Sequence, residues 1–150
     1  KKTECAVDIH ADAFLSKTYI PFAPQRMDLY KKIARIATEE DYEDMIDEMC
    51  DRFGEPAAPA VNLCRIALIR AHAAKAGFTK VIEREGTVQL IPQEINPVAI
   101  SALAERFPMC RIKVSLGALP TINAMMPKGK RNTEFLLELI GEYLEIVGKE

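Results

Sequence analysis

The sequence predicts an α+β fold in which a small twisted sheet, mostly antiparallel or mixed, packs against about five helices. Stretches with apolar residues at helical spacing fill most of the first half of the chain and its end, whereas alternating stretches gather in the second half. The length of 150 residues suits a single domain with a sizeable core, so we expect one domain over 1–150. An apolar share of 49% and a charged share of 28% are those of an ordinary soluble globular protein.

The chain begins with an alternating stretch. Residues 5–12 place apolar and polar side chains in turn, which predicts a strand with one solvated face. That face carries Asp8, His10 and Asp12, side chains that could bind a metal ion. No further His or Cys is placed nearby to complete such a site, so we expect a solvated strand face and no metal.

Three helices are predicted next. The first runs over about Pro24–Ala37, with the proline in its first turn and basic residues on its outer face. Thr38 and Asp41 resemble a capping box, so the second helix begins almost at once and spans about Glu39–Phe53. The third, about Pro59–Ala76, is apolar on nearly every side, as expected of a helix central to the domain.

Strands dominate the rest of the chain. They are expected at 81–84, 87–91, 110–116 and 119–126. The first two form a hairpin across Glu85-Gly86, and the last is expected at an edge of the sheet. Asn96-Pro97 opens a helix that continues through Phe107, because an N-cap residue precedes a first-turn proline. A final helix begins at Asn132 or Thr133.

The second helix carries charges that helix stability does not explain. Acidic residues crowd it from Glu39 to Asp51, and those near its C-terminal end are unfavourable with the helix dipole. Glu48, Asp51 and Arg52 share one face. The apolar stripe on another face consists of Met45, Ile46, Met49 and Phe53. The charged face is therefore either merely solvated, with Arg52 paired to Glu48, or a docking surface.

No motif indicates an enzyme. GxSxG and HExxH are absent, and Gly129-Lys130 fails as a phosphate loop because Ala124 and Arg131 occupy diagnostic positions. His72 lies in an apolar helix and is expected to be structural. We expect no catalytic residue and no cofactor. The cysteines are scattered without a CxxC pair, which predicts reduced structural thiols at Cys5, Cys50, Cys64 and Cys110.

A net charge of −2 gives no overall attraction to nucleic acid or to an anionic membrane. An accessory nucleic-acid-binding module remains an alternative, through Arg26, Lys31, Lys32 and Arg35 on the first helix and the turn Lys128–Arg131. No aromatic residues interleave with that turn to stack on bases, which favours a solvated turn. No apolar run is long enough to cross a bilayer and no secretion signal is evident, so we expect a cytoplasmic protein without a membrane partner.

Several spaced motifs occur in one order: Tyr19-Ile20-Pro21, Gln25-Arg26 with Leu29-Tyr30, Glu48-x-x-Asp51-Arg52-Phe53-Gly54, Asn62-Leu63 and Gly77-Phe78. Together they resemble the C-terminal (TRCF) domain of the bacterial transcription-repair coupling factors, the Mfd family. The resemblance is dense over 7–78 and rests on the pattern of elements beyond that. Ala23 replaces a usually polar or acidic helix-starting residue and Cys50 a usually aliphatic one, and neither lies on the charged face.

The resemblance implies a part of an ATP-driven DNA translocase that acts on stalled RNA polymerase and recruits UvrA. It implies that this domain is not the motor. The domain would fold back on the N-terminal UvrA-binding domain of the same protein, mask it and restrain the translocase. The contact residues implied by the resemblance are Glu48, Asp51 and Arg52. The motor and the UvrA-binding domain would lie upstream, and the start at Lys1 rather than methionine fits a segment of a longer protein.

Overall fold

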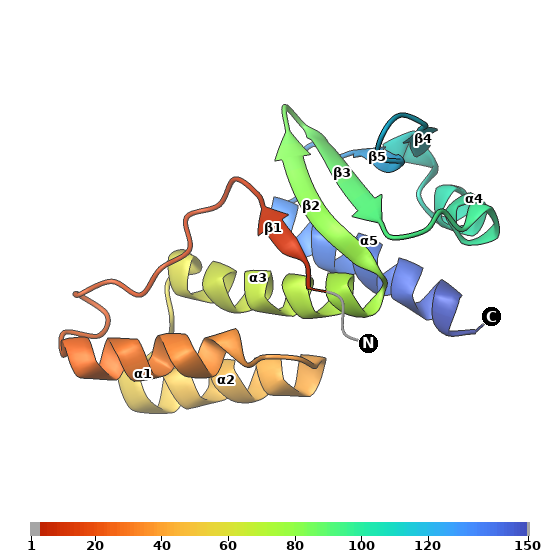
Figure 1. Cartoon of the computed structure of the whole chain (residues 1–150). Helices are drawn as coiled ribbons and strands as arrows, with labels where there is room; N and C mark the ends of the chain where they lie inside the picture. The colour runs from red at the N-terminus through yellow and green to blue at the C-terminus, as the bar shows by residue number, and fades with distance from the viewer. Residues whose placement is uncertain (1–3, 150) are drawn as a thin grey trace.

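The structure is a computed structural model that describes residues 4–149, so the outermost ends of the predicted 1–150 domain lie outside the described residues. Over that range the α+β prediction is confirmed, with five α-helices and one open five-stranded mixed sheet (Figure 1). The helices are α1 Ala23–Ala34, α2 Glu39–Phe53, α3 Ala58–Lys75, α4 Pro97–Arg106 and α5 Asn132–Gly148, with a short 3-10 helix at Pro108–Cys110. The strands are β1 Ala6–Asp8, β2 Phe78–Arg84, β3 Thr87–Pro92, β4 Lys113–Ser115 and β5 Thr121–Met125.

The sheet has the order β1-β2-β3-β5-β4. β1 runs parallel to β2, and the other neighbours are antiparallel. The expectation that 119–126 forms an edge strand is wrong, because β5 lies between β3 and β4 and pairs with both. Ile122 and Ala124 of β5 are buried, as an interior strand requires, and the short β4 takes the edge.

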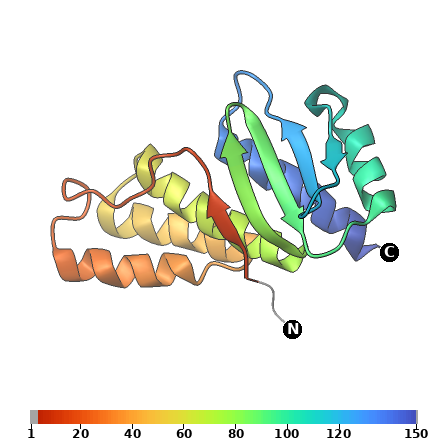
Figure 2. The same cartoon turned by 45° about the horizontal axis from the view of Figure 1, so that its top comes forward.

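Helices α3 and α5 cover one face of this sheet, and Figure 2 looks onto the other face, which carries no helix in the part of the chain that the structure describes. Between the helices and the sheet lies the larger hydrophobic core. Its fully buried members include Val81, Val88 and Leu90 from the sheet and Ile69 and Leu139 from the helices. The sheet therefore has one dry face and one solvated face.

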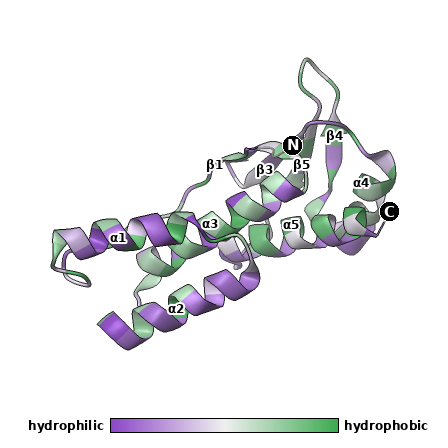
Figure 3. Ribbon diagram, turned by 60° about the horizontal axis from the view of Figure 1, so that its bottom comes forward, coloured by the Kyte–Doolittle hydropathy of each residue, from purple (hydrophilic) through white to green (hydrophobic). Residues whose placement is uncertain are grey.

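A second core joins α1 and α2 to the outer side of α3. Leu29 and Ile33 of α1, together with Met45 and Met49 of α2, are buried there. Because α3 contributes buried residues to both cores, its predicted central place is confirmed. In Figure 3 hydrophilic residues alternate with hydrophobic ones along the ribbon of α2.

Local signals set several element ends. The capping box is present: the Asp41 amide donates to Thr38 Oγ1 at 3.0 Å, and Asp41 Oδ2 accepts from the Thr38 amide at 3.2 Å. The same carboxylate also accepts a hydrogen bond from the Ala37 amide, so Ala37 is bonded to the first turn of α2. Helix α1 ends at Ala34 and not at the predicted Ala37. Glu85 and Gly86 both have positive φ, as a two-residue hairpin turn requires.

Two predicted strands are shorter than expected. Only Ala6–Asp8 of the stretch 5–12 pairs with a neighbour. Of the stretch 110–116 only Lys113–Ser115 is strand, since Cys110 ends the 3-10 helix and Arg111 is left-handed with φ 46°. None of the described helices has the length and apolar character needed to cross a membrane.

Candidate protein-docking site

Glu48 lies where α2 meets α1. The buried methionines of α2 fix the rotation of the helix and leave this carboxylate at the junction. Arg52 Nη1, one turn on, donates to Glu48 Oε2 at 2.7 Å. Lys32 Nζ of α1 donates to the same oxygen at 3.0 Å. The structure therefore joins two of the three predicted contact residues and adds a lysine that the second helix alone does not reveal.

These two cations determine the charge of the site. The hydrogen bond from Lys32, followed by that from Arg52, holds the pKa of Glu48 below its ordinary value. Glu48 is therefore ionised at neutral pH. Its side chain is 30% exposed, so solvent screens the ion pairs.

Arg52 is oriented by more than its ion pair. Its guanidinium lies 4.9 Å from the centroid of the Phe53 ring, and that ring packs edge-on against Tyr19 at 6.0 Å. The Tyr19 hydroxyl donates to the carbonyl of Gly54 at 2.7 Å, just where α2 ends. The motif Asp51-Arg52-Phe53-Gly54 is thereby tied to the segment that precedes α1.

Asp51 is exposed and makes no hydrogen bond or ion pair within residues 4–149. It is the member of the predicted face that a partner can reach without displacing an existing contact. The Arg52–Glu48 pair expected of a solvated face is also present. Both features sit on the same helical surface, so a docked partner would meet one free carboxylate beside an ion pair.

A groove of about 250 Å³ runs beside this surface. Its charged walls come from Lys32 of α1, from Arg35 just after that helix, and from Asp41, Asp44 and Glu48 of α2. Sequence reasoning identified the two charged faces separately and missed the groove. The short connection between the two helices, which forces the basic face against the acidic one, is the signal that could have indicated it.

The alternative nucleic-acid residues are partly engaged within the chain. Arg26 Nη1 donates to the carbonyl oxygens of Ile20 and Pro21, at 2.7 and 3.1 Å. Lys32 is paired with Glu48, and Lys130 with Glu138. These contacts leave fewer free cations on α1 and in the turn than the sequence pattern suggests.

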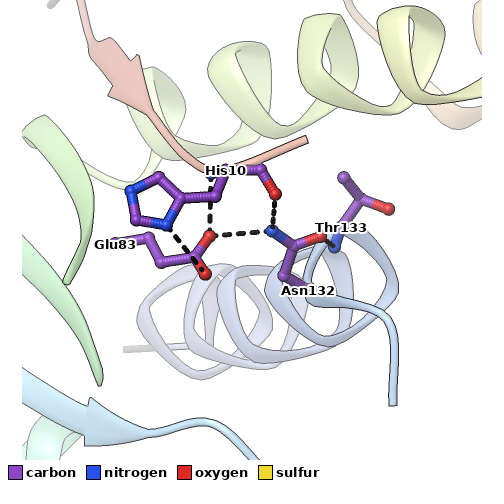
Figure 4. Close-up of polar contacts among 4 residues, drawn as sticks. All are labelled: His10, Glu83, Asn132 and Thr133. Carbon is purple, nitrogen blue, oxygen red and sulfur yellow. Dashed lines mark hydrogen bonds and ion pairs between the residues drawn. The ribbon is translucent and has the colours of Figure 1, made fainter. Parts of the chain in front are cut away.

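The row Asp8, His10 and Asp12 does not assemble a metal site, and no cluster of three potential ligands occurs among the described residues. His10 instead joins a polar network (Figure 4). Its Nδ1 lies 3.6 Å from Glu83 Oε2, and its amide donates to Glu83 Oε1 at 2.9 Å. The Asn132 amide group donates to both the His10 carbonyl and Glu83 Oε1, each at 2.7 Å. This network fastens the segment after β1 to β2 and to the start of α5.

Three of the cysteines match the structural interpretation. Cys5, Cys64 and Cys110 are buried free thiols, and burial raises the pKa of Cys5 to about 11 and that of Cys64 to about 12. Cys50 is a free thiol too, but it is exposed on α2. Burial lowers the pKa of the half-buried His72.

Comparisons with known proteins agree on one family. The family model described as TRCF domain matches residues 9–103. The transcription-repair-coupling factor of Escherichia coli is 31% identical over 105 residues, which is 68% of this chain and 9% of that protein. The transcription-repair-coupling factor of Bacillus subtilis is 30% identical over 102 residues, which is 68% of this chain and 8% of that protein. The transcription-repair-coupling factor of Staphylococcus epidermidis is 33% identical over 85 residues, which is 57% of this chain and 7% of that protein.

The chain thus spans less than a tenth of the length of these curated relatives. A solved structure extends the likeness over the whole fold. The crystal structure of a C-terminal domain of transcription-repair coupling factor superposes with a TM-score of 0.80 at 22% identity, covering 99% of this chain and 97% of that one. The similarity of fold therefore continues through β5 and α5, beyond the segment matched by the family model.

Proposed function

The chain belongs to the TRCF domain family, and on that premise we propose that it is a regulatory, non-catalytic domain of a transcription-repair coupling factor. The parent protein would be an ATP-dependent DNA translocase that acts on stalled RNA polymerase and recruits UvrA. In this proposal the domain docks on the N-terminal UvrA-binding domain of the same protein. Docking masks that surface and restrains the translocase until polymerase is engaged.

The observation that carries the proposal is the surface of Glu48, Asp51 and Arg52. Arg52 is held between Glu48 and the Phe53 ring, so its position is fixed before any partner arrives. Asp51 beside it is exposed and without an intramolecular partner in the described part of the chain. A pre-ordered cation next to a free carboxylate suits a partner surface with the opposite arrangement of charges.

Contacts of this kind fit a reversible clamp. An exposed ion pair contributes about 0–1 kcal/mol, whereas truncating one partner of a desolvated interface pair costs about 2–5 kcal/mol. A few such pairs hold a closed form and still allow polymerase binding to shift the population. A large apolar interface would resist that opening.

The test is charge reversal in the full-length protein. Glu48→Lys combined with Asp51→Lys should raise the basal ATPase rate and increase UvrA binding, because like charges now destabilise the closed form. Each single variant is compared with Glu43→Lys, which reverses one charge at an exposed position of the same helix, roughly 140° around it from Glu48. If the double variant is folded by circular dichroism and its ATPase rate and UvrA binding equal those of the wild type, the interface assignment is wrong.

A further inference from the structure

The open face of the sheet presents a continuous row of side chains across all its strands. The register places Asp8, Ile82, Gln89, Asn123 and Lys113 side by side, from β1 through β2, β3 and β5 to β4. Since alternate residues of a strand share a face, Lys80 and Arg84 flank Ile82, and Thr87 flanks Gln89. Helices α3 and α5 lie behind this surface (Figure 2).

Cations dominate the surface. Lys80, Arg84, Arg111 and Lys113 are all exposed, and none of them makes an ion pair or hydrogen bond through its side chain within residues 4–149. Cations elsewhere, such as Lys32, Arg65 and Arg106, are paired with carboxylates. Among the described strand residues that point to this side, Asp8 on the edge strand is the one carboxylate. The open face is therefore locally basic in a chain whose net charge is −2.

Two of these cations border a hollow of about 240 Å³ at the β4 side. Arg111 and Lys113 form its basic wall, and Thr87, Asn123, Ala124 and Met125 complete the lining. Arg111 reaches this position from a left-handed backbone conformation, with φ 46°, two residues before the start of β4. The hollow thus combines two positive charges with a hydroxyl and an amide group.

We propose that the open sheet face of this domain binds the phosphate backbone of duplex DNA through Lys80, Arg84, Arg111 and Lys113. Arginine, lysine, threonine and asparagine are side chains that contact phosphates. Tight protein interfaces centre on a few buried aromatic or arginine anchors, whereas the exposed large apolar side chain on this face is Met125, at 47%. No aromatic residue of the described strands points to this side, so base stacking on a single strand is not supported.

The dimensions suit a duplex. Lys80 and Arg84 are about 13 Å apart along β2, and three strand spacings separate β2 from β4, about 14 Å. Duplex DNA of that length carries roughly eight phosphate charges. The acidic helix α2 lies beyond α3, on the side away from the sheet (Figure 1). Packed helix axes lie about 8–10 Å apart, and α3 stands between α2 and the sheet, so the charges of α2 lie beyond the roughly 10 Å over which 0.1 M salt leaves them effective on DNA at the open face.

The experiment measures the fluorescence anisotropy of a labelled duplex of about 20 base pairs titrated with the chain at low salt. The open-face variant is Lys80→Gln with Arg84→Gln and Lys113→Gln. The control variant removes three other exposed cations, Lys31→Gln with Arg35→Gln and Lys128→Gln, and so matches the change in charge. Circular dichroism confirms that both fold.

The proposal predicts that the open-face variant binds the duplex more weakly, by about tenfold or more for each phosphate interaction removed, at about 50 mM salt. The logarithm of the binding constant falls linearly with the logarithm of the salt concentration. The proposal also predicts that the steepness of this line decreases by about 1 for each phosphate interaction removed. The control variant should retain most of the affinity. The proposal is overturned if the wild-type chain does not bind the duplex, or if only the control variant loses binding. It is also overturned if the wild-type chain binds polyglutamate as tightly as the duplex, because that result would indicate an acidic protein partner. The assay uses no other domain, so its outcome is independent of the docking proposal.

Discussion

Glu48 is the residue at which two helices and the proposed docking surface meet. One of its oxygens accepts hydrogen bonds from Lys32 of α1 and Arg52 of α2. The carboxylate therefore orients Arg52 and also connects α1 to α2. A change at this position alters the orientation of Arg52 as well as the charge of the surface. Asp51, which has no such internal contact in the described residues, separates the two effects.

Glu48→Gln should lower the stability of the chain slightly, in a way that depends on pH. The folded-state pKa of Glu48 is depressed by Lys32 and Arg52, so its contribution is present above the unfolded value of 4.5 and is lost as pH falls through the folded pKa. At pH 7 we expect a loss of no more than about 1 kcal/mol, because solvent screens the pairs. Urea unfolding of wild type and variant at neutral pH and near pH 3 measures this. A deficit of the same size at both pH values would contradict it.

At the scale of elements, sequence signals were most reliable where the chain itself supplies the cap or the turn. The bounds of α2 follow from Thr38, Asp41 and Gly54, and the structure has them where the sequence predicts them. The hairpin followed equally from Glu85-Gly86. The interior place of β5 and the parallel pairing of β1 could not be predicted, because both depend on contacts with strands distant in the sequence. The 9–12 stretch kept its alternating burial but bonds to Glu83, Asn132 and Asn62 rather than to a strand.

Thr38→Ala should destabilise the chain by about 1 kcal/mol, because it removes the side chain that accepts from the Asp41 amide at the start of α2. For a chain of this size that corresponds to a fall in Tm of about 2–4 °C. Thr38→Ser keeps the hydroxyl and is the control. Thermal unfolding followed by circular dichroism measures both variants. If alanine and serine behaved alike, the cap would not be what stabilises this end of α2.

At the scale of the whole molecule, α3 separates two surfaces of opposite character. On one side lies α2 with its acidic surface, packed beside α1, and on the other lies the sheet with its basic open face (Figure 1). The acidic helix and the face shared by Glu48, Asp51 and Arg52 could be predicted from spacing within one segment, and the docking role of these residues stays a prediction. The basic face could not, because Lys80, Arg84 and Lys113 come together only through the register of strands that are not consecutive in the sequence.

The separation of these surfaces lets each proposal be tested without disturbing the other. A partner domain on α2 leaves the open sheet face accessible, and DNA on the sheet leaves Asp51 accessible. In the docking proposal the contact is intramolecular. Its effective concentration is then of millimolar order, so even weak affinity between separated domains suffices to hold a closed form.

The most direct test of the docking account is calorimetric titration of this chain into the separately produced N-terminal UvrA-binding domain of the same protein. We predict saturable binding with a dissociation constant below about 1 mM, weakened by salt. Asp51→Lys should weaken it at least about tenfold, as expected when a charge pair at an interface is removed, and Glu43→Lys should leave it unchanged. Absence of binding at millimolar concentration, or equal affinity of the wild type and Asp51→Lys, would contradict the account.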